Sequence, residues 1–188
     1  SQRNDLTEDA ILDLLVATVS LKYTQSNSVT VAFDGQVIGT GAGQQSRVHC
    51  TRLACGKADK WMLQQHPRAL GLKFRPELKR PEKMNVIDQY LLWDELSEAE
   101  ITALNAQLLE PAVPLTPPER RQWIDSFKGI ALSSDAFFPF RDNVDRAARS
   151  SIQFLLQAGG SLRDDEVIAA ANEYGMTMAM SGQRWFLH

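Results

Sequence analysis

The sequence predicts an α/β protein of three layers, in which helices cover both faces of a mixed, largely parallel sheet. The first observation is an apolar strand at 130–132, followed by a helix at 143–150 and a second strand at 152–156. A crossover of this kind joins parallel strands. The second is a further helix between Ser161 and Gly175 that leads to a strand at 176–180. The third is the alternation of helices with short strands along the chain, which is typical of this class.

The first helix begins after Thr7, a good N-cap residue, with Glu8 and Asp9 in its first turn, where acidic side chains face the positive helix end. Large apolar side chains cover most of its circumference, so it is expected to be buried between layers. These side chains are Ile11, Leu12, Leu14, Leu15, Val16 and Val19.

A hairpin follows, because two apolar runs, 29–33 and 36–39, flank Asp34-Gly35. Glycines at 39, 41 and 43 then precede a helix that opens at Ser46 and runs through Trp61 or beyond. Two interpretations of these glycines remain. They cradle an anion on backbone N–H groups, or they let a strand pack closely against a helix.

The whole chain is expected to form a single domain, residues 1–188, with a helical, proline-rich insertion at about 93–118. The basic segment 68–84 is interpreted as a solvated face rather than a binding patch, with an exposed connector at 72–78. Pro117-Pro118 is typical of a helix start.

The loop 132–146 follows the first strand of the crossover and holds three aromatic rings within four residues. Open α/β sheets bind ligands at the carboxyl ends of their strands. The rings either form flat walls for a planar heterocycle or fill the core beneath a turn. In the first case Asp135, Arg141 and Asp142 would contact the polar edges of the ligand.

Composition excludes several classes of protein. With 44% hydrophobic and 23% charged residues the chain is of ordinary globular type, and its net charge of -3 gives no electrostatic case for binding nucleic acid or an anionic membrane. No apolar run approaches the ~20 residues of a membrane span, and the N-terminus lacks the apolar core of a signal peptide. Cys50 and Cys55 are interpreted as structural thiols in a reduced cytoplasm rather than zinc ligands.

Four stretches resemble the family of bifunctional purine enzymes that joins AICAR transformylase to IMP cyclohydrolase. They are SSDAFFPFRDNVDRA at 133–147, KYTQSNS at 22–28, GTGAGQQSR at 39–47 and RWFLH at 184–188. The resemblance implies that the chain is the second of two tandem cytidine-deaminase-like domains of the transformylase region. It also implies a transfer of the formyl group of 10-formyltetrahydrofolate to the 5-amino group of AICAR.

The resemblance also implies site residues. Asn27 would lie at the reacting centre, as the catalytic residue of this chain, and Arg47, Phe137 and Arg184 would bind the nucleotide. The folate would contact a further set: Val48, Asn85, Phe137, Pro139, Phe140 and Asp142. His188 matches a terminal histidine of the family. Taken singly, each has a structural alternative, with Asn27 as a cap, Arg47 and Arg184 in surface ion pairs and Asp142 as a helix N-cap.

The family binds a potassium ion beside the active site. Thr24, Ser26, Ser28 and Asp135 match its oxygen ligands. The alternative is a local cluster of hydrogen bonds. Zinc is not expected, because the H-x-E and P-C-x-x-C pattern of zinc nucleoside deaminases is absent.

The family's catalytic lysine-histidine pair lies in the first transformylase domain, and no Lys-His dipeptide occurs in this sequence. The chain therefore carries ligand-positioning residues without the proton-transfer group. The resemblance implies that it works with a first transformylase domain, within a homodimer. The alternative is a non-enzymatic module that binds folate or nucleotide.

Overall fold

The computed structural model describes residues 1–186, which divide into two compact units. The sheet unit comprises Ser1–Asp59 and the chain from Asp125 onward, and the helical unit is Lys60–Ile124. The segment at about 93–118, expected as an insertion, falls within the helical unit.

The sheet unit is built on five strands in the order β2-β1-β3-β4-β5. Their bounds are β1 Val29–Phe33, β2 Gln36–Gly41, β3 Ala131–Ser134, β4 Phe154–Gln157 and β5 Thr177–Met180. The β1 strand is antiparallel to both of its neighbours, whereas β3, β4 and β5 pair in parallel. Four strands therefore share one direction and β1 opposes them, which confirms a mixed sheet.

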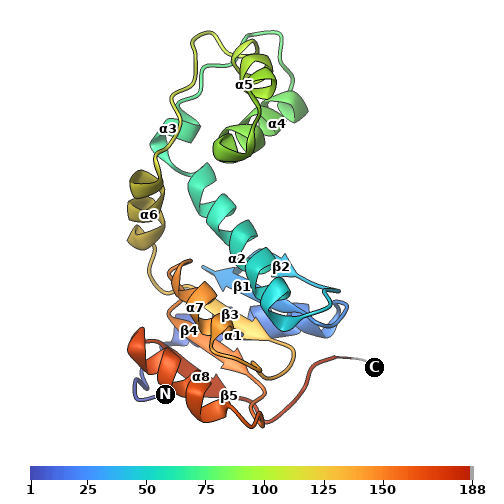
Figure 1. The fold of residues 1–188 in the computed structure, drawn as a ribbon, viewed down its shortest axis with the longest axis vertical. Helices are drawn as coiled ribbons and strands as arrows, with labels where there is room; N and C mark the ends of the chain where they lie inside the picture. Colours follow the sequence, from blue (N-terminus) through green and yellow to red (C-terminus); the bar gives the residue numbers. More distant parts are fainter. Residues whose placement is uncertain (187–188) are drawn as a thin grey trace. The chain divides into compact units, whose positions relative to one another are not determined.

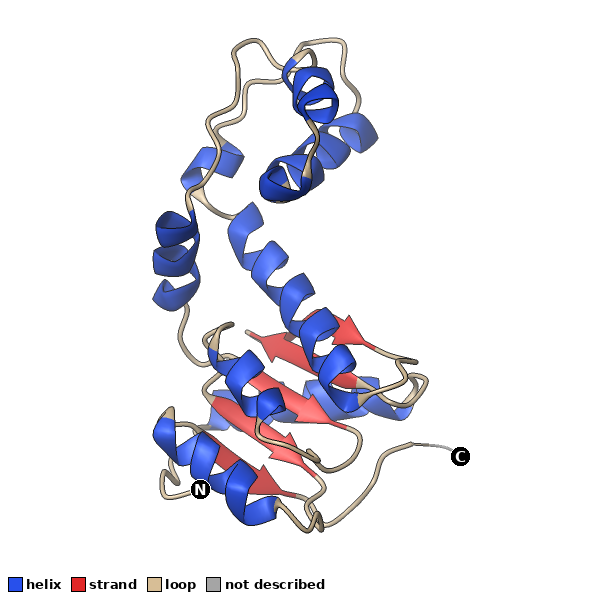
Figure 2. Ribbon diagram, viewed as in Figure 1, coloured by secondary structure: helices blue, strands red, loops and turns tan. Residues whose placement is uncertain are grey.

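Helices cover both faces of this sheet (Figures 1 and 2). The α1 helix (Glu8–Lys22) packs on one face, and the start of α2 (Arg47–Gln64), with α7 (Asp142–Ala148) and α8 (Asp164–Glu173), covers the other. Both predicted crossovers are present, β3-α7-β4 and β4-α8-β5, and each joins parallel strands. The three-layer α/β/α class is confirmed.

The expectation that α1 is buried between layers is wrong. Its buried apolar stripe is Ala10, Leu14, Ala17 and Leu21, which repeats at helical spacing and faces the sheet. The larger side chains on the opposite side are exposed by 44–59%: Ile11, Leu12, Leu15 and Val19. The prediction failed because it weighed only large side chains, whereas the stripe that faces the strands alternates alanines with leucines.

The hairpin β1–β2 has a tight turn, and the glycines in β2 bring that strand close to α2. Asp34 and Gly35 both have positive φ, as a tight two-residue turn requires, and the buried Asp13 carboxylate accepts hydrogen bonds from their N–H groups at 3.1 and 2.7 Å. A Cβ on Gly39 or Gly41 would lie 2.2 Å from a backbone oxygen of α2. Of the two interpretations, close strand–helix packing is therefore the one that the structure supports.

The helical unit consists of short helices around a small apolar centre. They are α3 (Pro67–Leu70), α4 (Arg80–Leu91), the 3-10 turn η1 (Trp93–Glu95), α5 (Glu98–Asn105) and most of α6 (Pro117–Ser126). Buried Tyr90 holds the proline-rich segment in place, because its hydroxyl donates to the Val113 carbonyl at 2.8 Å. Among residues 1–186, no helix has the length and apolar character that crossing a bilayer requires.

Candidate functional site

Three segments of the sheet unit meet where β3 ends. Because β1 is antiparallel to β3, the start of β1 lies beside the end of β3, with Val29 opposite Ser134. One residue further, the Asp135 N–H donates to the Ser28 carbonyl at 3.2 Å. The third segment is the start of α2, which carries Arg47. This edge holds most of the residues that the sequence suggested.

Arg47 and Asp135 form a buried ion pair at this edge. Arg47 is 7% exposed and Asp135 fully buried, and Arg47 Nη1 donates both to Asp135 Oδ1 and, at 3.0 Å, to the Ser28 carbonyl. The alternative of a surface ion pair for Arg47 is therefore wrong. Burying two charges is favourable only where further hydrogen bonds satisfy them, and the Ser28 carbonyl supplies one.

Three buried oxygens beside this pair have no hydrogen-bond partner within the part of the chain that the structure describes. They are Ser28 Oγ, Ser134 Oγ and Asp135 Oδ2. Nearly all buried polar atoms in proteins are paired, so these three oxygens are candidates for contacts with a ligand, ion or water. Of the other two expected potassium ligands, Thr24 and Ser26 are half-buried, and the Thr24 hydroxyl donates to the Leu21 carbonyl at 3.1 Å.

Asn27 is tied to the loop that precedes α2. Its Nδ2 donates to the Gln44 carbonyl at 3.0 Å, and its own carbonyl accepts from the buried Cys50 thiol at 2.7 Å. Burial raises the pKa of the Cys50 thiol, which keeps the proton that it donates. Asn27 is half-buried, so its side chain is held in place without being enclosed. The sequence predicted a structural thiol at Cys50 but not its partner Asn27, because a thiol one turn into a helix gives no signal of what it contacts.

The aromatic loop divides its rings between core and surface. Phe138 is fully buried, and its N–H donates to Oε1 of the buried Gln157 at 2.8 Å. Phe137 is half-buried with the Arg184 guanidinium 5.5 Å from its ring centre, and the 49% exposed Phe140 lies below Arg163 at 5.0 Å. The interpretation that the rings fill the core is therefore confirmed for Phe138 alone, and ligand binding by the other two rings stays a prediction. Phe138 fills the core, and Phe137 and Phe140 remain available to a ligand.

Asp142 is exposed and is the first residue of α7. The helix N-cap is Arg141, so the alternative that Asp142 is the cap is wrong. Its Oδ1 accepts a hydrogen bond at 2.9 Å from Nδ2 of Asn143, which is fully buried. Asn143 lies inside the stretch that the sequence singled out, yet only its burial in the fold marks it as important.

The remaining predicted residues are more scattered. Val48 is half-buried on α2, and the half-buried Pro139 lies within the aromatic loop. Arg184 is exposed and its guanidinium lies over the Phe137 ring, while the next residue, Trp185, donates its N–H to the Asp135 carbonyl at 2.9 Å. Asn85 is exposed on α4 of the helical unit, and His188 lies outside the described residues.

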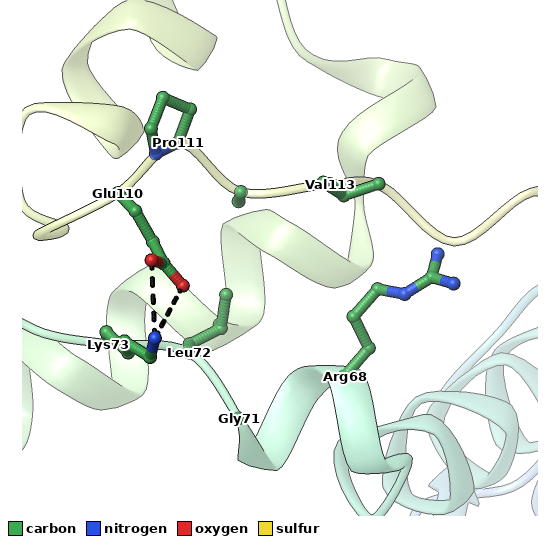
Figure 3. Close-up of a pocket in the computed structure, with 8 residues that line it drawn as sticks. Arg68, Gly71, Leu72, Lys73, Glu110, Pro111 and Val113 are labelled. Atoms are coloured by element: carbon green, nitrogen blue, oxygen red, sulfur yellow. Dashed lines mark hydrogen bonds and ion pairs between the residues drawn. The ribbon is translucent and has the colours of Figure 1, made fainter.

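A cavity of about 370 Å³ in the helical unit is not a comparable site (Figure 3). Its cationic side chains are neutralised: Lys73 pairs with Glu110 at 3.1 Å, and Arg68 pairs with Glu119 at 2.6 Å. These pairs agree with the interpretation of the basic segment as a solvated face.

Comparison with known proteins shows which family this chain is similar to. Residues 1–57 match the family described as AICARFT/IMPCHase bienzyme. The chain is 34% identical over 182 residues, 97% of its length, to the bifunctional purine biosynthesis protein PurH of Magnetococcus marinus. It is 35% identical over 178 residues, 95% of its length, to PurH of Cereibacter sphaeroides. The resemblance to the AICARFT/IMPCHase bienzyme family is confirmed.

The chain spans 24% and 23% of the length of these two PurH relatives. The similarity to the Magnetococcus marinus relative extends over 182 of the 188 residues. Both relatives are named as purine biosynthesis proteins, so a role in purine biosynthesis is supported for the family that the four stretches resemble.

Proposed function

We propose that this chain is part of a formyltransferase that moves the formyl group of 10-formyltetrahydrofolate to the 5-amino group of AICAR, giving FAICAR in de novo purine biosynthesis. The observation that supports this most is the contact among all four family-like stretches. Gly43 N–H donates to the Gln25 carbonyl at 2.7 Å, Arg47 pairs with Asp135, and Trp185 N–H donates to the Asp135 carbonyl. These contacts bring stretches as far apart as residues 25 and 185 to one end of the sheet.

The proposed chemistry makes three demands. The amine of AICAR is a poor nucleophile, because its lone pair is delocalised into the ring and carboxamide. The reaction therefore needs two planar ligands held in line, a base for the departing proton and donors for the developing oxyanion. The residues at this edge suit the first and third demands.

The aromatic loop suits planar ligands. Phe137 and Phe140 offer accessible ring surfaces, and Pro139 stiffens the backbone between them. The Asp142 carboxylate can accept two hydrogen bonds from the amino edge of a pterin. Val48, on α2, is proposed as a further folate contact.

The polar residues suit the nucleotide and the reacting centre. Asn27 has a donor and an acceptor for a carboxamide or formyl oxygen. Arg47 uses Nη1 for its buried partners, and a guanidinium has further N–H groups to give a ligand. Arg184, exposed beside Phe137, is proposed to meet the phosphate end of AICAR.

A potassium ion fits the buried oxygens. Ser28 Oγ and Asp135 Oδ2 are unpaired within the described chain, and the Thr24 hydroxyl keeps its lone pairs while it donates to Leu21. With Ser26 they form a set of oxygen donors, which suits a hard cation and not zinc. The ion would supply positive charge beside the site and share the Asp135 carboxylate with Arg47.

The base is the missing part. None of the three histidines, His49, His66 and His188, stands in a Lys-His pair. We therefore propose that the first transformylase domain of the family supplies the base, and that the working enzyme is a homodimer.

The proposal is tested by equilibrium binding of AICAR and of 10-formyltetrahydrofolate to the 188-residue chain and its variants. Phe137→Ala is expected to weaken AICAR and folate binding about tenfold, and Asp142→Ala to weaken folate alone, because each removes a contact worth roughly 1–2 kcal/mol. Asp165→Ala is the matched control, since Asp165 is also an exposed carboxylate in the first turn of a helix, α8. Unchanged folate affinity with a lowered melting temperature in Asp142→Ala would mean that Asp142 is only structural.

A further inference from the structure

Asn143 is a buried amide that contacts both the Phe140 end of the aromatic loop and Asp142. It is fully buried, and its Nδ2 donates to the Phe140 carbonyl at 3.2 Å and to Asp142 Oδ1 at 2.9 Å. Its Oδ1 accepts from the Thr51 hydroxyl at 2.8 Å. The orientation of the amide is fixed, because a carbonyl and a carboxylate can only accept and must face the NH₂ group.

Thr51 connects this amide to α2, the helix that carries Arg47. It is fully buried in α2, one helical turn after Arg47, and its hydroxyl also lies 3.2 Å from the Arg47 carbonyl. The residues Arg47, Thr51, Asn143 and Asp142 therefore form one continuous chain of polar contacts. It joins two segments that lie 92 positions apart at the Thr51–Asn143 step.

An exposed carboxylate without such a partner would sample several rotamers, and a ligand would have to order it on binding. The Asn143 amide holds Oδ1 of Asp142 in one place from a buried, fixed position. Because each carboxylate oxygen has two lone pairs, Asp142 keeps free acceptors for a ligand.

We propose that Asn143, oriented by Thr51, is the positioning residue that aims the Asp142 carboxylate and the Phe140 end of the aromatic loop at the folate. This rests on the proposed function, in which Asp142 binds the pterin edge. Neither Asn143 nor Thr51 touches the ligand, so their effect reaches the folate through Asp142 and Phe140.

Thr51 gives the sharpest test, because two substitutions separate its hydroxyl from its shape. Thr51→Val removes the hydroxyl and keeps the branched side chain, whereas Thr51→Ser keeps the hydroxyl and loses a methyl group. Titration of the 188-residue chain with 10-formyltetrahydrofolate is expected to show about tenfold weaker binding for Thr51→Val, and Thr51→Ser within about twofold of the unchanged chain. AICAR affinity is expected to stay within about twofold for both.

Thr102→Val is the control, since the hydroxyl of the exposed Thr102 likewise lies close to the carbonyl four residues earlier, to which it donates at 2.8 Å, but in α5 of the helical unit. It is expected to leave folate affinity unchanged. Equal losses in Thr51→Val and Thr51→Ser would mean that packing, and not the hydroxyl, matters, and this would overturn the proposal.

The double variant Thr51→Val/Asp142→Ala separates this proposal from the proposed function. Because Thr51 acts through Asp142 as well as Phe140, Thr51→Val is expected to cost less folate affinity in the Asp142→Ala background than in the unchanged chain. Additive losses would overturn the positioning role. If Asp142→Ala itself leaves folate affinity unchanged, the folate role of Asp142 fails, and the positioning role fails with it. If Asp142→Ala weakens folate and Thr51→Val does not, the positioning role alone fails.

A measurement without ligand completes the test. NMR of the Asn143 side-chain NH₂ is expected to show slow hydrogen exchange in the unchanged chain and in Thr51→Ser, and at least about tenfold faster exchange in Thr51→Val. Exchange as fast as that of the exposed Asn85 in the unchanged chain would overturn the proposal, whatever the affinities.

Discussion

Asp135 carries the buried negative charge of the site. Its carboxylate is fully buried, Oδ1 is paired with Arg47, and Oδ2 has no partner in the described chain. An unpaired buried oxygen costs roughly 1–3 kcal/mol, and more when it is charged. A bound cation would remove that cost, so the stability of the chain should depend on which cation is present.

Replacing potassium by tetramethylammonium at equal ionic strength is expected to lower the melting temperature by about 3 °C. This corresponds to roughly 1–1.5 kcal/mol, the stabilisation from an ion present at about ten times its dissociation constant. The bulky cation cannot enter between Ser28 and Asp135, and zinc is not expected to substitute. Differential scanning calorimetry measures the shift.

Asp135→Asn is the comparison for this experiment, because it removes the charge and keeps the shape. Its melting temperature should be lower than that of the unchanged chain in both salts, since Arg47 loses its counter-charge, and should respond little to the cation. Identical melting curves for the unchanged chain in both salts would contradict the potassium site.

At the scale of elements, the close contact of β2 with α2 places Arg47 and Thr51 beside the end of β3. Glycines at 39 and 41 allow it, since any side chain there would meet the helix backbone. The sequence showed the glycines but left two interpretations open, because the same alternation serves an anion cradle and a close packing. Only the position of α2 separates them, and that depends on contacts distant in sequence.

Gly39→Ala is expected to lower the free energy of unfolding by about 3 kcal/mol or more, because its Cβ would lie 2.2 Å from the Ala54 carbonyl oxygen and neither backbone can yield cheaply. Gly56→Ala is the control within α2, where a Cβ meets nothing within 4 Å. It should be neutral or stabilise by about 0.5–1 kcal/mol. Denaturant unfolding measures both, and a mild Gly39→Ala would contradict the close packing.

The outer end of the aromatic loop is tied to α8 by a cluster of charges. Arg141 donates to Asp145 at 2.9 Å and to Glu173 at 2.8 Å, and these hydrogen bonds hold the pKa of each carboxyl below its ordinary value. A lowered folded-state pKa stabilises the fold above the ordinary pKa and loses that contribution as the pH falls through the lowered value. The cluster should therefore weaken on acidification below about pH 4.

Between about pH 5 and pH 3, the melting temperature of Asp145→Asn is expected to fall less than that of the unchanged chain, because one of the titrating groups is gone. The difference should be small, since Asp145 is 28% and Glu173 56% exposed and solvent screens both. Asp165→Asn, at an exposed carboxylate of α8, serves as the control and should follow the unchanged chain. Parallel loss in all three chains would contradict the role of the cluster.

At the scale of the whole molecule, local patterns predicted the elements better than their faces. The crossovers through α7 and α8 were clear, because strand and helix signals alternate there without interruption. The exposed side of α1 was not, because hydrophobicity alone cannot tell which face meets the sheet. The links Arg47–Asp135 and Thr51–Asn143 join positions 88 and 92 residues apart. No periodicity reports such pairs, and only the resemblance suggested that their segments belong together.

The chain alone is expected to show no measurable formyl transfer, even with saturating AICAR and 10-formyltetrahydrofolate. Its residues align ligands and donate hydrogen bonds, but it lacks the Lys-His pair, and general-base catalysis is typically worth ~10²–10⁴-fold. It spans 24% of the length of its Magnetococcus marinus relative, so contacts made by the rest would be absent and the substrates poorly aligned. The assay follows loss of 10-formyltetrahydrofolate, first with the chain alone and then with a separately expressed first transformylase domain of the family. Activity that appears only on mixing supports a shared active site, whereas ligand binding without activity in either case favours the non-enzymatic binding module. Robust turnover by the chain alone would require a base within it, and the exposed His49, beside Arg47 and Val48 on α2, would be the first residue to replace.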